Sequence, residues 1–284
     1  MEELSLLQAV ILGAVQGATE FLPVSSSGHL VLGQALLGVK LGGESLLAFN
    51  ICLHFGTLLA ILVVFWRDLV AIFHSVISLK LNGKEAAQDD VFEQEALSPS
   101  QGKRLFWFIF LGTIPAGTIG IGFKDFFTAL AADPLSASYM LIVTGLILFG
   151  TRFVKPGNIR IANLRFWQVF GIGIAQALAI VPGISRSGST IAAALYLGIN
   201  RELAARFSFL LAIPAIAGAT ILGLDDLRYF RKEDLIAILA GTIVAFIVGL
   251  FCIKWLLHIV RRGKLAWFAV YCWVVGILGL VFFS

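Results

Sequence analysis

Two stretches of the chain decide its fold: residues 13–38, GAVQGATEFLPVSSSGHLVLGQALLG, and residues 171–198, GIGIAQALAIVPGISRSGSTIAAALYLG. Each is apolar over most of its length and is interrupted in the middle by proline, glycine and a cluster of serines. At membrane depth such a break is tolerated only where the backbone is buried in protein or lines a wet cavity. We therefore expect the apolar regions 4–38 and 164–199 to form two re-entrant hairpins, each made of two half-helices.

The composition of the whole chain is typical of a membrane protein. Of its 284 residues 59% are hydrophobic and 13% charged, against about 25% charged in an ordinary soluble domain. The mean hydropathy is +0.94, and a soluble fold of this size could not hide so much apolar surface in one core. Disorder, a disulfide scaffold and a free nucleic-acid binder are excluded. The net charge of +4 instead fits cytoplasmic loops rich in Lys and Arg.

Six further stretches are apolar enough to cross a bilayer, which takes about 20 residues. They cover approximately residues 46–66, 104–122, 137–154, 203–223, 235–256 and 265–283. The only long polar stretch runs from Lys80 to Arg104 and is predicted to be an exposed loop. The sequence therefore predicts one all-α integral membrane domain over residues 1–284, with six transmembrane helices and two re-entrant helical hairpins.

The two broken stretches match each other at a constant offset of 160 residues. Seven identities fall on this offset without a gap: Gly13 and Gly173, Gln16 and Gln176, Ser25 and Ser185, Ser27 and Ser187, Gly28 and Gly188, Leu37 and Leu197, and Gly38 and Gly198. Some matches between common residues arise by chance, but these centre on both breaks, which favours a duplication. Each repeat, about 4–154 and 164–283, holds a hairpin and three spans, so the second inserts upside down. Paired broken helices in inverted repeats point to a binding site near the midplane.

Basic residues gather on one side of this topology. That side carries Arg67, Lys80, Lys84, Lys103, Arg104, Arg152, Lys155, Arg160, Arg165, Arg201, Lys254, Arg261, Arg262 and Lys264, and the other carries Lys40, Lys124, Arg228, Arg231 and Lys232. The richer side is expected to be cytoplasmic. Both termini then face outward, the hairpins enter from opposite sides, and their tips meet inside the membrane.

Ionisable residues at membrane depth are costly and mark a candidate functional site. Glu20 lies just before the break of the first hairpin, on the same helix face as Gln16, and His29 follows the serine turn. Arg186 lies among the serines of the second hairpin. Free backbone N–H groups at a helix start, hydroxyls and a guanidinium together bind anions, so we expect a phosphate or diphosphate between the hairpins.

Structural explanations compete with this interpretation. Ser25 and Ser189 are typical helix N-caps, and His29 is equally consistent with a hydrogen-bonding residue at a helix end. Glu20 and Arg186 would also serve as an ion pair that locks the two hairpins together.

Three further polar residues lie within the predicted spans. Asn50 and His54 either line the cavity or bond between helices. Arg206 is expected to pair with Glu202, four residues earlier.

Two motifs resemble those of a known family. Residues 16–29, QGATEFLPVSSSGH, resemble the (E/Q)xxxE-FLPVSS-x-GH motif of the undecaprenyl-diphosphate phosphatases, the bacitracin-resistance family of bacterial inner-membrane enzymes. Residues 182–190, PGISRSGST, resemble that family's PG-x-SRS-x-x-T motif, and the hydropathy pattern is similar over essentially the whole chain. The resemblance implies hydrolysis of undecaprenyl diphosphate to undecaprenyl phosphate and inorganic phosphate, which recycles the lipid carrier for cell-wall synthesis. It also implies a site open to the periplasm.

By the same resemblance the functional positions are Glu20, Ser26, His29 and Arg186. Further substrate contacts are expected from Gln16, Ser25, Ser27, Ser185, Ser187 and Thr190. Ser26 is the candidate nucleophile, with His29 or Glu20 as proton acceptor, and direct attack by a water that Glu20 activates stays open. Glu20 and Gln16 are expected to hold a divalent cation, Mg²⁺ or Ca²⁺, that bridges to the diphosphate. Many members have Glu where this chain has Gln16, which argues against an obligatory two-carboxylate mechanism here.

Other functions are weighed against this one. The phosphatidic-acid-phosphatase type also has a Ser-Arg motif, but there a His and then an Asp follow, and the SGSTIAAALYLG after Arg186 has neither. A transporter or flippase of a phosphate-bearing lipid stays open, because secondary transporters share this architecture. The expected partners are the lipid substrate and membrane lipids, without nucleic acid, and a homodimer is left open.

Overall fold

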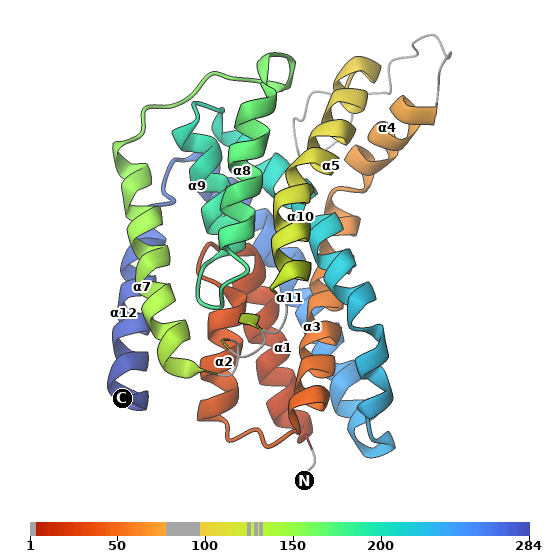
Figure 1. The fold of residues 1–284 in the computed structure, drawn as a ribbon, viewed down its shortest axis with the longest axis vertical. Coiled ribbons are helices and arrows are strands. Elements are labelled where there is room, and N and C mark those ends of the chain that lie inside the picture. Colours follow the sequence, from red (N-terminus) through yellow and green to blue (C-terminus); the bar gives the residue numbers. More distant parts are fainter. Residues whose placement is uncertain (1–3, 78–96, 124–125, 128–129, 131–132) are drawn as a thin grey trace.

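The computed structural model describes residues 4–77, 97–123, 126–127, 130 and 133–284, and most of them are helical. Among these residues the only β-structure is an isolated bridge between Ile159 and Ile199. Figure 1 shows helices running along the long axis of the molecule, with both chain ends toward the same end. The prediction of an all-α membrane protein is confirmed.

The first broken stretch forms a helical hairpin of α1 (Leu6–Phe21) and α2 (Ser26–Leu36). A capping box between Ser5 and Gln8 starts α1. The helix ends just before Pro23, which disfavours helical backbone at the residue preceding it. Ser25 caps α2, since its Oγ accepts the N–H of Gly28 at 3.3 Å. The break predicted from the sequence therefore lies between residues 21 and 26.

The second broken stretch forms a hairpin of α8 (Phe166–Leu178) and α9 (Arg186–Tyr196), and its geometry follows that of the first. Ser185 caps α9 by accepting the N–H of Gly188 at 3.0 Å, and α2 and α9 each have 11 residues at the same offset of 160. Such agreement is what a duplication would leave, and the duplication itself stays a prediction.

Each predicted span falls on a helix: α3 (Gly43–Val64), α5 (Pro99–Gly122), α7 (Pro134–Gly150), α10 (Arg201–Leu222), α11 (Leu235–Arg261) and α12 (Trp267–Phe283). In the described part of the chain, five helices are long and apolar enough to cross a membrane, namely all of these except α12. Because α12 has 17 residues, its crossing stays a prediction. The protein is thus a multi-pass membrane protein.

The sequence did not predict the amphipathic helix α4 (Trp66–Ile77), and it placed the end of the polar loop too late. The structure starts α5 at Pro99, inside the loop predicted to reach Arg104. The reason is local: Ser98 and Gln101 form a capping box, and proline at the first helical position has a suitable φ. Residues 80–96 of that loop and Lys124 lie outside the described residues.

The two hairpins approach each other from opposite ends of the molecule, and their turns meet near its middle (Figure 1). At the meeting point Ser187 Oγ donates to the carbonyl oxygen of Leu22 at 3.2 Å, and Gly28 lies against the backbone of Gly183. A side chain at Gly28 would crowd that backbone, so glycine allows the close approach. The turns that carry the candidate site are therefore held directly against each other.

One predicted ion pair is replaced by another. Arg206 on α10 does not pair with Glu202; it donates through Nε and Nη2 to the two carboxylate oxygens of Asp68 on α4. Glu202 instead accepts from Arg261, at 2.7 Å. A bidentate contact to a buried carboxylate satisfies the planar guanidinium better than one contact to a neighbour on the same helix. The pair thereby fastens the unpredicted helix α4 to the core.

Candidate active site

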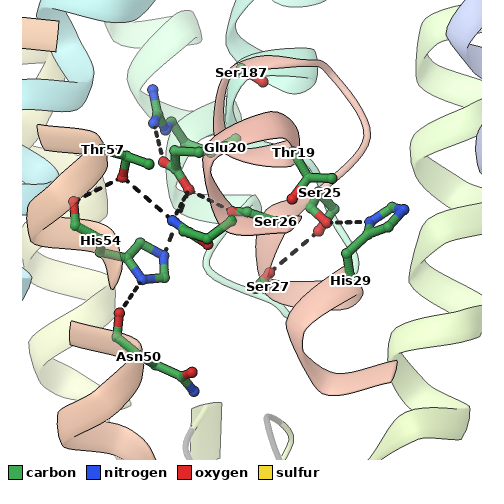
Figure 2. Close-up of polar contacts among 12 residues, drawn as sticks. Thr19, Glu20, Ser25, Ser26, Ser27, His29, Asn50, His54, Thr57 and Ser187 are labelled. Atoms are coloured by element: carbon green, nitrogen blue, oxygen red, sulfur yellow. Dashed lines mark hydrogen bonds and ion pairs between the residues drawn. The ribbon is translucent and has the colours of Figure 1, made fainter. Parts of the chain in front are cut away.

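Glu20 is the centre of the candidate site, near the end of α1 and just before the first turn (Figure 2). The residue is 7% exposed, and its carboxylate receives hydrogen bonds from three elements. Arg186 Nη2 donates to Oε1 at 2.6 Å, Ser26 Oγ donates to Oε2 at 2.5 Å, and Gln16 Nε2 donates to Oε2 at 3.1 Å. A buried carboxylate with this many donors stays ionised and fixed in orientation.

Arg186 brings the second hairpin into the site from the first turn of α9. One terminal nitrogen, Nη2, is used in the ion pair with Glu20. The other, Nη1, is buried and has no hydrogen-bond partner among the described residues. Because an unmet buried donor is costly, this nitrogen is well suited to a ligand oxygen. Arg186 can therefore serve both roles that the sequence left as alternatives. Its Nη2 forms the ion pair between the hairpins, and its Nη1 is available to an anion.

Ser26 is the first residue of α2 and is only partly buried. The residue before it, Ser25, has φ of +70°, the only positive φ outside glycine among the described residues. Left-handed backbone at a residue with a side chain is strained, and such strain concentrates at functional sites. Its counterpart Ser185 has an ordinary φ of −73°. Of the two serine turns, the strained one carries the hydroxyl that points at Glu20.

His54 and Thr57 on α3 complete one side of the site. His54 Nε2 lies 3.6 Å from Glu20 Oε2, while its Nδ1 donates to the carbonyl of Asn50. Thr57 Oγ1 accepts from Gln16 Nε2 at 3.4 Å. His54 thus lines the site, whereas the Asn50 side chain accepts from Gln34 on α2 and bonds between helices. The polar spacing 50, 54 and 57 on one apolar helix was the signal for these residues, and Thr57 was missed because threonine is common in spans.

His29 does not contact the carboxylate of Glu20, and Figure 2 shows its ring turned away from Glu20 and Ser26. Its Nδ1 lies 2.7 Å from the carbonyl oxygen of Ser25, and its Nε2 lies 2.9 Å from the hydroxyl of Tyr271. Since a carbonyl only accepts, Nδ1 carries the proton and a neutral ring accepts from Tyr271. In this structure Glu20, not His29, is the base in contact with Ser26.

The remaining predicted substrate-binding hydroxyls are engaged within the hairpins. Ser25 and Ser185 accept from the helix starts that they cap, and Ser27 and Ser187 each lie 3.3 Å from the capping hydroxyl. Thr190 donates to the carbonyl of Arg186 and lies against Ser208 Oγ. These contacts shape the turns, and a direct role of the five hydroxyls in substrate binding stays a prediction.

The residues fit a divalent cation in one respect. Gln16 Oε1 is fully buried and has no partner among the described residues, and it belongs to the side chain that already contacts Glu20. One amide oxygen and one carboxylate are hard ligands of the kind that Mg²⁺ and Ca²⁺ take, with the rest supplied by phosphate and water. The described residues hold no cluster of three or more His, Cys, Asp or Glu side chains that would bind a metal alone.

Fold and site together define an integral membrane protein in which a buried carboxylate is hydrogen-bonded to a hydroxyl and to a guanidinium from the facing hairpin. Comparison with known proteins agrees with this class. The family model described as bacitracin resistance protein BacA matches residues 9–278. Proteins named undecaprenyl-diphosphatase are similar over nearly the full length. The one from Desulfatibacillum aliphaticivorans is 45% identical, covering 97% of this chain and 98% of its own.

Similar proteins of the same name come from distant organisms. That from Methanosphaera stadtmanae is 43% identical and that from Halothermothrix orenii 40% identical, each covering 98% of both chains. The chain belongs to the bacitracin resistance protein BacA family.

Proposed function

We propose that this protein hydrolyses undecaprenyl diphosphate to undecaprenyl phosphate and inorganic phosphate. The observation that carries the proposal is the triangle of Ser26, Glu20 and Arg186: a hydroxyl donates to a buried carboxylate, and a guanidinium on the facing hairpin keeps one donor unused. The names of the similar proteins supply the substrate. A transporter of a phosphate-bearing lipid would need no hydroxyl paired with a base.

Phosphate release tests this proposal directly. The full chain, purified in detergent, is mixed with undecaprenyl diphosphate, and inorganic phosphate and undecaprenyl phosphate are measured together. The proposal predicts both products in equal amounts. A protein that binds or moves the lipid without releasing phosphate would be a transporter, and the proposal would be wrong.

In the mechanism that this geometry supports, Ser26 Oγ attacks the terminal phosphorus while Glu20 Oε2, 2.5 Å away, takes its proton. The bond between the terminal phosphorus and the bridging oxygen breaks, and undecaprenyl phosphate leaves with the bonding electrons. Arg186 Nη1 and the N–H groups at the start of α2 stabilise the charge on the phosphoryl oxygens.

The second step regenerates the free hydroxyl of Ser26. A water attacks the phosphorus of the phosphoserine, the bond from phosphorus to Oγ breaks, and the carboxyl of Glu20 gives its proton back to Oγ. The proton of the attacking water leaves with the departing phosphate, so Ser26 is again a hydroxyl, Glu20 is again a carboxylate, and the enzyme ends as it began. Each step uses the one hydrogen bond between Ser26 and Glu20.

A divalent cation is part of the proposal. Gln16 Oε1 and Glu20 would hold it, and when bound it neutralises charge on the diphosphate. Glu20 already receives three donors, so the unpartnered Gln16 oxygen is the more open ligand.

We further propose that the protein lies in the bacterial inner membrane with its termini and the active site toward the periplasm. The support is the excess of Lys and Arg at the opposite end of the molecule. Glu20, Ser26 and Arg186 all come from one chain, so the proposed catalytic contacts form within a single protomer.

Arg186→Lys is expected to lower turnover on the order of a hundredfold although the charge is kept. One ammonium cannot both pair with Glu20 and reach the phosphate as the two guanidinium nitrogens do. The measurement is steady-state phosphate release, with Arg165→Lys, at the start of α8 and outside the site, as the matched control. Near-normal turnover of Arg186→Lys would contradict the two-pronged role.

A further inference from the structure

A groove of about 540 Å³ opens between the end of α1, the end of α11 and the start of α12. Its walls are mostly apolar and aromatic, with Leu22 at the inner end and Trp255 and Trp267 farther out. Of the described residues that line it, Lys264 alone is charged, and it lies in the turn between α11 and α12. The groove therefore runs from the tip of the first hairpin to the end of the molecule opposite the chain termini.

We propose that this groove is a binding site for an anionic phospholipid, with an acyl chain along the apolar walls and the phosphate at Lys264. Basic pockets between transmembrane helices on the cytoplasmic side bind anionic headgroups. Arg261 and Arg262 precede Lys264 in the chain, but Arg261 donates to Glu202, so Lys264 is the cation that faces the groove. Trp267, which begins α12 three residues after Lys264, is a residue type typical of the interface between headgroups and hydrocarbon.

The groove is linked to the serine turn by two hydrogen bonds. Tyr271 lines the groove, and its hydroxyl contacts His29 Nε2 at 2.9 Å, with the two rings stacked 5.5 Å apart. His29 in turn contacts the carbonyl oxygen of Ser25, the strained residue before Ser26. A lipid packed against Tyr271 would hold this chain of contacts in place, so the bound lipid is expected to raise the activity. The expected rise in activity rests on the proposed function, whereas the binding of the phospholipid does not.

Binding is measured by fluorescence in bilayers of defined composition. The full chain is reconstituted in phosphatidylcholine that contains increasing fractions of dibrominated phosphatidylglycerol or, separately, of dibrominated phosphatidylcholine. Bromine quenches tryptophan fluorescence on contact. The quenching that belongs to the groove is the difference between the unmodified protein and a variant in which Trp255 and Trp267 are both changed to Phe. Half-quenching is expected at about fivefold lower fraction of the anionic lipid, since one lysine near a membrane surface gives a preference of this size.

Lys254, ten residues before Lys264 and within α11, provides the matched comparison. Lys264→Gln is expected to abolish the preference, and Lys254→Gln, an exposed residue on α11 outside the groove lining, is expected to keep it. Equal quenching by both brominated lipids in the unmodified protein would mean ordinary lipid contact and would overturn the proposal. So would a preference that survives Lys264→Gln.

Activity gives the second readout. Phosphate release is expected to rise severalfold when phosphatidylglycerol is added to the unmodified protein and to stay unchanged in Lys264→Gln. Selective quenching without any change in release would overturn the link through Tyr271 and His29. If the protein released no phosphate in any bilayer, the proposed function would fail while the fluorescence result still decided the lipid site.

Discussion

Ser26→Ala is expected to lower phosphate release by on the order of 10⁴-fold or more, because removal of a nucleophile leaves only binding and charge stabilisation. The hydroxyl is 2.5 Å from the carboxylate that would take its proton, and no other serine of the turn contacts Glu20 in the described structure. Ser45→Ala is the matched control: Ser45 is also partly buried, and its hydroxyl donates to the carbonyl of Tyr229, outside the site. Its turnover is expected to stay within severalfold of the unmodified protein.

A trapping experiment separates the two chemical routes. Substrate labelled in its terminal phosphate is mixed with excess enzyme and quenched in acid within milliseconds to seconds. The serine route predicts label on the peptide that contains Ser26, and none in Ser26→Ala. Substantial turnover of Ser26→Ala, together with an unlabelled protein, would establish direct attack by a water that Glu20 activates.

Much of the fold follows from local patterns of the sequence. Both breaks were located because Pro23 and Pro182 interrupt apolar runs and serines follow that cap the next helix. The spans were located because about 20 apolar residues are the minimum that crosses a bilayer. Helix α4 was missed because 12 amphipathic residues at the end of a span look like the beginning of the polar loop.

The sequence pointed to Gln16, Glu20, Ser26 and Arg186, which the structure brings together, but not to their contacts; it missed Thr57, and it included His29, which lies apart. Glu20 and Arg186 were found from their cost at membrane depth, and the structure joins them across 166 positions of sequence. His29 illustrates the limit: its place in a motif shows neither where the ring points nor that it contacts the hydroxyl of Tyr271, 242 positions away. Pairings such as that of Arg206 with Asp68 depend on how helices pack, which periodicity within one helix does not reveal.

Glu20→Gln is expected to lower turnover on the order of 10³-fold or more, because it removes both the base for Ser26 and the counterion of Arg186. Removing one partner of a buried ion pair also costs stability, about 3–5 kcal/mol. The thermal unfolding of the variant is therefore measured beside its phosphate release. A folded Glu20→Gln variant with normal turnover would show that Glu20 has no part in the mechanism. If the variant is unfolded at the assay temperature, Glu20→Asp is measured instead, because it keeps the charge and withdraws the carboxylate from Ser26.

Gln16→Glu is the complementary change at the same spot, since it adds a carboxylate where Gln16 Nε2 now lies 3.1 Å from Glu20 Oε2. Two carboxylates this close resist carrying both charges unless a cation lies between them. We therefore expect Gln16→Glu to stay active, to depend more steeply on Mg²⁺ or Ca²⁺, and to reach half-maximal turnover at a lower metal concentration than the unmodified protein. In Glu20→Gln no anionic side chain is left to bind the cation together with the unpartnered Gln16 oxygen. We therefore expect that the turnover of this variant does not recover at any metal concentration. All three proteins are titrated with metal at one fixed pH. Identical metal dependence of Gln16→Glu and the unmodified protein would show that position 16 only orients the substrate through hydrogen bonds.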